Sequence, residues 1–125
     1  MTSVALAPDP AAVRRARHFA RDCCARAALD ETVTGTVVLL TSEAVTNAFM
    51  HGRSEARLRV TVHPDRVLVE VGDDNTRHPR QADLDDDALD GRGLLLMIAL
   101  AQSWGVRDES IGKTVWFEVS SLAAT

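Results

Sequence analysis

The longest apolar pattern in the chain runs from Thr32 to Gly52 and has the period of a helix. Its apolar residues recur at intervals of three and four positions, which places them on one wide stripe of an α-helix. We therefore expect a largely buried helix that stops at Gly52. The stripe contains Val33, Val37, Leu40, Ala44 and Ala48, and it is widened by Val38, Val45 and Phe49.

Two polar residues stand inside this apolar helix. Glu43 and Asn47 are four positions apart, so their side chains leave the same face one turn apart, and His51 continues the row. An unpaired acid or amide in a packed core costs roughly 1–3 kcal/mol. The row therefore faces a partner, a cleft or a polar ligand. The spacing alone also fits a half-exposed polar stripe on an amphipathic helix.

The residues before this helix predict one strand and one helix. A short edge strand is expected from Ser3 to Ala7. Asp9 has the residue type of an N-cap, and Pro10 suits the first helical position, so a helix should run from there to about Leu29.

The residues after the long helix predict strands around one more helix. Apolar and polar residues alternate on both sides of a turn, which is typical of a hairpin with one buried face. An unbroken apolar run after two glycines predicts a buried helix, and two strands follow it. The expected elements are the hairpin strands 57–62 and 67–71, the helix 94–101, and the strands 104–107 and 114–119.

A polar, acidic segment separates the hairpin from the apolar helix. Its alternating aspartates at 83, 85 and 87 are similar to those of a calcium loop. However, Ala88 stands where that loop requires glycine, and Leu94 stands where it requires glutamate. We therefore expect residues 76–90 to form a solvated, mobile flap.

The composition is that of an ordinary globular protein. The 125 residues suit one domain, 1–125, and the formal net charge of -4 gives no general attraction for nucleic acid. No leader pattern and no membrane-length apolar run occur, so we expect a cytoplasmic protein without a membrane or nucleic-acid partner. Cys23 and Cys24 are adjacent and lack metal-ligand spacing, so we expect both in the core. Arg14, Arg15 and Arg21 form a basic face that is either solvated or a docking surface.

Four motifs occur in order along nearly the whole chain. They are Ser-Glu-Ala-Val-Thr-Asn-Ala at 42–48, Val-Glu-Val-Gly-Asp at 69–73, Gly-Arg-Gly-Leu-Leu-Leu at 91–96 and Gly-Lys-Thr-Val-Trp-Phe-Glu at 112–118. Their order resembles the GHKL ATPase superfamily. Within it, the chain is most similar to stand-alone anti-sigma-factor serine kinases and related ATP-binding regulators of actinomycetes. The resemblance implies a histidine-kinase-like ATPase domain, an α/β two-layer sandwich. Its mixed, mostly antiparallel sheet would carry about three helices on one face.

The resemblance also implies roles for single residues. Asn47 would bind magnesium through its amide oxygen, and Glu43 would take the proton from an attacking water or serine hydroxyl. Asp73 would accept a hydrogen bond from the adenine amino group of ATP, and Thr114 would support the adenine directly or through water. The backbone N–H groups of Gly91, Arg92, Gly93 and Leu94 would hold the phosphates, together with the guanidinium of Arg92.

Three functions are compatible with these residues. The first is an ATP-dependent protein serine kinase that phosphorylates a small antagonist protein and sequesters a sigma factor. The resemblance implies that it pairs as a homodimer through its N-terminal region. The second is a non-catalytic ATP-binding module that regulates partner binding. It is motivated by Asn75, which stands where many relatives have glycine. The third is a two-metal phosphodiesterase using Glu43, Asp73 and Asp74, although the sequence offers no basic groove for its substrate.

Overall fold

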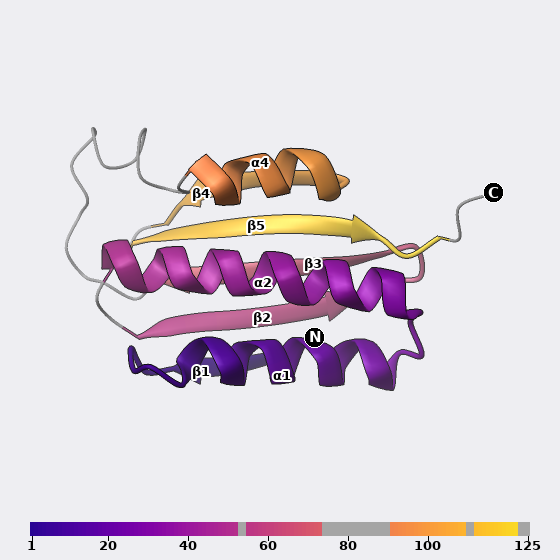
Figure 1. The fold of residues 1–125 in the computed structure, drawn as a ribbon, viewed down its shortest axis with the longest axis horizontal. Coiled ribbons are helices and arrows are strands. Elements are labelled where there is room, and N and C mark those ends of the chain that lie inside the picture. The colour runs from indigo at the N-terminus through magenta and orange to yellow at the C-terminus, as the bar shows by residue number, and fades with distance from the viewer. Residues whose placement is uncertain (53–54, 74–90, 110–111, 123–125) are drawn as a thin grey trace.

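The computed structural model describes residues 1–52, 55–73, 91–109 and 112–122. These segments contain three helices and five strands (Figure 1). In chain order they are β1 (Thr2–Leu6), α1 (Ala12–Arg26), α2 (Glu31–Gly52), β2 (Ala56–Val62), β3 (Arg66–Asp73), α4 (Gly91–Leu100), β4 (Ser103–Asp108) and β5 (Lys113–Ser120). The expected flap 76–90 lies outside the described residues.

The strands form one sheet in the order β1-β2-β3-β5-β4. The predicted hairpin is confirmed: β2 and β3 pair from Ala56 opposite Asp73 to Val62 opposite Val67. Each of the four pairings within the described strands is antiparallel, so the expected parallel component of the sheet is missing from this part of the chain.

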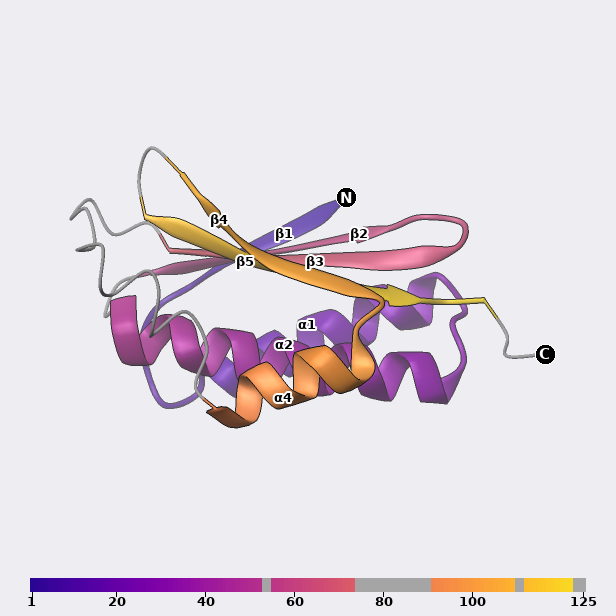
Figure 2. The same cartoon turned by 90° about the horizontal axis from the view of Figure 1, so that it is seen from above.

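The three helices cover one face of this sheet, and no described helix covers the other, which we call the bare face (Figure 2). Alternate strand residues such as Val69, Val71 and Phe117 point under the helices and are fully or almost fully buried. They pack against the apolar stripe of α2 in one core. The predicted two-layer sandwich is therefore confirmed, with α1, α2 and α4 as its helical layer.

Helix α1 is shorter than the sequence predicts. It begins at Ala12, because Asp9 accepts a hydrogen bond from the Ala11 N–H at 2.9 Å and closes a turn before the helix. It ends at Arg26, and Ala28 adopts a positive φ of 57° that stops helical hydrogen bonding. Alanine has no preference for that conformation, so the residue type does not predict this end of the helix.

Helix α2 confirms the prediction within one residue at its start. Asp30 accepts the N–H of Val33 at 2.8 Å, which satisfies one of the free donors of the first turn. Glu31 then begins a helix of 22 residues, and Gly52 is its last residue.

Helix α4 corrects the expectation of a buried helix. Met97 is fully buried and holds the helix against the core, but Leu95 is 68% exposed and Ile98 is 60% exposed. The unbroken apolar run has no period, so it could not show which side would face the core. The glycines Gly91 and Gly93 lie inside the first turn of α4 rather than before it.

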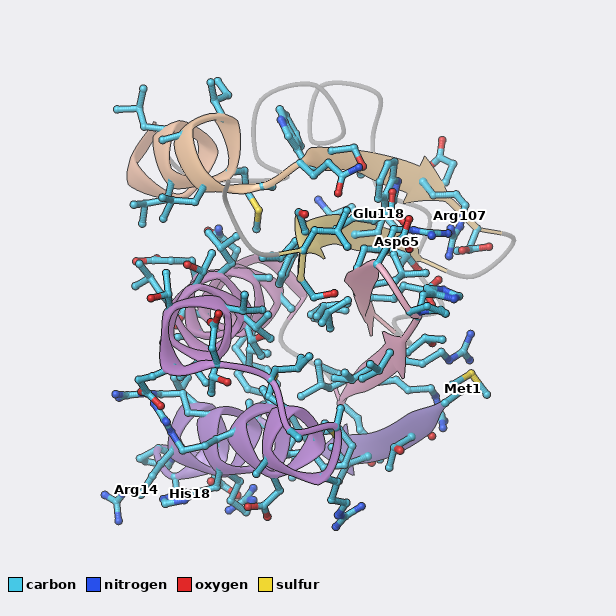
Figure 3. The ribbon with its side chains drawn as sticks, turned by 90° about the vertical axis from the view of Figure 1, so that its right-hand side faces the viewer. Met1, Arg14, His18, Asp65, Arg107 and Glu118 are labelled. Carbon is cyan, nitrogen blue, oxygen red and sulfur yellow. The ribbon has the colours of Figure 1, made fainter. Side chains whose placement is uncertain are left out.

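Ion pairs cross the bare face of the sheet. Arg107 of β4 donates to Glu70 of β3 at 2.6 Å, and Arg66 of β3 donates to Glu118 of β5 at 2.5 Å (Figure 3). The indole of Trp116 lies directly over Gly105, whose missing side chain leaves room for it. The Arg107–Glu70 pair and the contact between Trp116 and Gly105 tie β4 to β3 and β5. The Arg66–Glu118 pair joins β3 to β5.

Both cysteines are buried in α1, as predicted. Burial raises the pKa of the Cys23 thiol and the pKa of the Cys24 thiol. Of the helices that the structure describes, none combines the length and the apolarity that a membrane crossing requires.

Candidate functional site

Two residues of the polar row of α2, Glu43 and Asn47, are buried, and the side chain of His51 lies outside what the structure describes. Glu43 is 7% exposed and Asn47 is 2% exposed, although both are polar. They lie at the border of the apolar stripe, because Leu40 and Ala44 are their fully buried neighbours on the helix surface. The half-exposed stripe that the spacing also allowed is therefore ruled out.

The row faces away from α1. Thr34 lies beside the thiol of Cys24 of α1, which fixes the side of α2 that points to that helix. Because successive helix residues are about 100° apart, Glu43 lies roughly opposite Thr34 around α2. In the helical layer α2 lies between α1 and α4 (Figure 1). The side chain of Glu43 therefore points to the side of α2 on which α4 lies.

The amide of Asn47 is buried and has no partner in the described part of the chain. Neither its Oδ1 nor its Nδ2 has a hydrogen-bond partner within the described residues, and both atoms are buried. A buried, unpaired amide costs about 1–3 kcal/mol, so natural proteins rarely keep one without a use. A carboxamide oxygen is a hard ligand of the kind that Mg²⁺ prefers, so this residue fits the implied magnesium site.

Asp73 is the last residue of β3 and pairs with Ala56. Strand residues two positions apart share a face, and Val69 and Val71 of the same strand are buried beneath the helices. Position 73 is the next in this row, at the end of the strand. The side chain of Asp73 lies outside what the structure describes, so its predicted adenine contact stays a prediction.

The glycines of the third motif form the first turn of α4. The first N–H groups of a helix lack intrahelical partners, and together with the helix dipole they favour an anion. Gly93 is buried, and α4 packs directly on α2. The side chains of Arg92 and Leu94 lie outside the described residues, so their predicted phosphate contacts remain untested.

Thr114 does not share this face. It pairs with Gly72, and its Oγ1 lies 3.4 Å from where a Cβ of Gly72 would stand, on the bare side of the sheet. Arg107, and secondarily the hydroxyl of Thr114, hold the pKa of Glu109 below its usual value. The structure thus places Glu43 and Asn47 on the side of α2 that packs against α4, and it places Thr114 on the opposite face of the sheet.

The alternation of β5 carried this information. Val115, Phe117 and Val119 are the buried row of that strand, so Thr114 belongs to the opposite row. A motif match selects a residue by its type and does not consider which face of the strand its side chain is on.

Metal-binding chemistry in the described part of the chain is limited. No group of three or more His, Cys, Asp or Glu side chains is placed there to hold a metal ion. Asp74, which the phosphodiesterase hypothesis requires, lies outside the described residues.

Comparisons with known proteins agree with this geometry. The family model for the histidine kinase-like ATPase domain matches residues 6–119. Among solved structures, a chain of the SiaB–SiaC complex from Pseudomonas aeruginosa has a TM-score of 0.66 and 11% sequence identity, covering 96% of this chain and 88% of that chain. No curated protein matches significantly in sequence. Because the family model spans most of its length, this chain belongs to the histidine kinase-like ATPase family.

Proposed function

We propose that this protein binds ATP with magnesium between α2 and the glycine turn of α4 and acts as a serine kinase on a partner protein. The observation that carries the proposal is the buried Asn47 amide, whose oxygen and nitrogen are unpaired within the described chain one turn after the buried Glu43. A site that keeps such an amide is prepared for a polar ligand. The family match supports a nucleotide as that ligand.

Each residue would contribute one interaction. Magnesium, when bound, would neutralise phosphate charge. The Asn47 oxygen would hold the ion, and the backbone N–H groups from Gly91 to Gly93 would hold the phosphates. Asp73 would select adenine, because its carboxylate accepts from an amino group that guanine lacks at that position. Thr114 is left out of this proposal, since its hydroxyl lies on the bare face of the sheet.

Glu43 is the proposed general base. An ionised carboxylate has only acceptor oxygens and can take the proton of a serine hydroxyl as that hydroxyl attacks the terminal phosphate. Its place on a buried helix, one turn from Asn47, would hold the carboxylate near that phosphate without relying on a loop.

The proposed partners are a small antagonist protein as substrate and a sigma factor as the regulated target. The similar fold in the SiaB–SiaC complex supports a protein partner, since that structure is a complex of two proteins. We further propose a homodimer that works in the cytoplasm, where ATP is available.

Calorimetry with ATP, ADP and GTP, each with and without magnesium, tests the nucleotide site. We expect adenine nucleotides to bind and GTP to bind at least about tenfold more weakly, which corresponds to about 1.4 kcal/mol. We also expect affinity for ATP to fall without magnesium, and Asn47→Ala to remove that dependence. A protein that ignores all three nucleotides would overturn the site.

Transfer of labelled phosphate to a candidate antagonist tests the kinase. Glu43→Gln keeps the size of the side chain but removes its basicity, so we expect nucleotide binding to remain and transfer to fall by about 10²–10⁴-fold. Equal transfer by the variant would remove Glu43 from its role. Tight ATP binding without transfer to any antagonist would favour the non-catalytic regulatory module.

A further inference from the structure

One row of arginines on α1 is not used by the proposed nucleotide site. The helix contains five arginines and a single acid, Asp22, whereas the whole chain has a formal net charge of -4. Positive charge is therefore concentrated on one helix of an acidic protein. Such an asymmetry builds a local field that the total charge conceals.

Four residues of α1 form one continuous row. Arg14 lies three positions before Arg17 and four before His18, and Arg21 lies four after Arg17 and three after His18, so the side chains of these pairs have a Cβ separation of about 5–6 Å. All four are exposed. Figure 3 shows Arg14 and His18 on the outer side of α1, pointing away from the sheet. We call these four residues the basic stripe.

Most of this charge is not neutralised within the described chain. Over residues 1–52, 55–73, 91–109 and 112–122, Arg14 and Arg17 have no carboxylate partner. Arg21 pairs with Glu31 at 3.1 Å, but both side chains are exposed, and such pairs contribute little to stability. Arg21 can therefore exchange this partner for another at small cost.

The opposite side of α1 explains why the stripe is held firmly. Ala12, Ala16 and Ala20 are fully buried against the core, and their small side chains allow the helix to pack closely. The arginines thus stand on a fixed frame rather than on a loop. A fixed frame favours a ligand whose charges have a matching spacing.

We propose that the basic stripe is a docking surface for an acidic segment of a partner protein. The segment would present carboxylates about one helical turn apart, which matches the spacing of Arg14, Arg17 and Arg21. A protein segment fits better than nucleic acid, because the rest of the chain outside α1 is more acidic than the whole and would repel a long polyanion. The partner need not displace a nucleotide, since α2 lies between α1 and α4 (Figure 1).

The probe is a fluorescent alanine-based peptide of about 16 residues, long enough to form a helix, with glutamates at intervals of three and four positions. The comparison probes are a peptide of equal composition with scattered glutamates, a short DNA duplex, and anionic lipid vesicles. We expect the spaced peptide to bind most tightly and to lose affinity as salt is raised. The variant Arg14→Glu/Arg17→Glu should bind it about tenfold or more weakly.

The matched control is Arg26→Glu, compared with Arg14→Glu alone. Both arginines are exposed on α1, and the two changes alter the net charge equally, but Arg26 lies about 120° around the helix from Arg14. Arg26→Glu should change affinity by about twofold or less. Thermal unfolding without nucleotide shows whether each variant folds, so the result does not depend on ATP binding. The proposal is overturned if neither peptide binds, if both peptides bind equally, if Arg26→Glu has the same effect, or if DNA or vesicles are preferred.

Discussion

Replacing Asn47 by leucine should make the protein more stable and less able to bind a nucleotide. The two side chains have similar volume, but leucine has no polar atoms to leave unpaired in this buried position. Removing an unsatisfied buried amide should recover about 1–3 kcal/mol in the absence of ligand. For a chain of 125 residues, about 1 kcal/mol corresponds to about 4 °C in Tm. We therefore expect Tm to rise by about 4–12 °C without nucleotide.

The nucleotide should offset most or all of this difference. At a free concentration of 100 times Kd, a bound ligand stabilises a folded protein by about 2.7 kcal/mol. The natural protein should gain that amount with ATP and magnesium, while Asn47→Leu should gain almost nothing. Thermal unfolding monitored by circular dichroism, with and without ATP and magnesium, measures both effects on the same samples.

Thr41→Val is the control on the same helix. The Oγ1 of Thr41 is also buried and unpaired within the described residues, but Thr41 lies on the far side of α2 from Glu43. This variant should be stabilised without ligand and should still respond to the nucleotide. The reasoning fails if Asn47→Leu lowers Tm without nucleotide, because the amide would then be satisfied in the free protein.

Three further predictions concern the fold. Gly105→Ala should destabilise it by about 1–3 kcal/mol in urea unfolding, because a Cβ there would stand 2.9 Å from the indole of Trp116; an unchanged midpoint would contradict this contact. Gly35→Ala should stabilise it by about 0.5–1 kcal/mol, because Gly35 lies inside α2 with nothing within 4 Å of its added Cβ; a lower midpoint would show an unseen clash. The hydrogen bond from Ser103, and then the one from Arg66, hold the pKa of the Glu118 carboxyl below its value in the unfolded chain. Its contribution to stability should therefore be present above the unfolded pKa and be lost as pH falls through the folded pKa, so the stability difference between the natural protein and Glu118→Gln should shrink in acid.

The parts of the fold with a clear local period were predictable. The hairpin alternates over both strands, and α2 shows the period of a helix over its whole length, so both were found within a residue or two. Helix α4 was misjudged because a continuous apolar run contains no period. The end of α1 at Ala28 was missed because a positive φ at alanine is decided by the surrounding structure.

The candidate site divides in the same way. Glu43 and Asn47 were found because polar residues in an apolar stripe conflict with burial, and the conflict is visible in sequence. Which groups surround the Asn47 amide depends on residues far apart in the chain, so only the structure could show that no described residue forms a hydrogen bond with it. Strand alternation predicts the face on which Thr114 lies, but matching a motif does not use this alternation.

The two neighbouring thiols of α1 provide a built-in reporter of motion. Only the thiolate reacts with alkylating reagents, and burial both hides these sulfurs and raises the pKa of each. Cys24 is fully buried whereas Cys23 is 7% exposed, so modification of Cys24 must wait until the packing around α1 opens locally. The rate of labelling at Cys24 would measure how often this opening occurs, and no mutation is needed. A partner bound to α1 would lower that labelling rate.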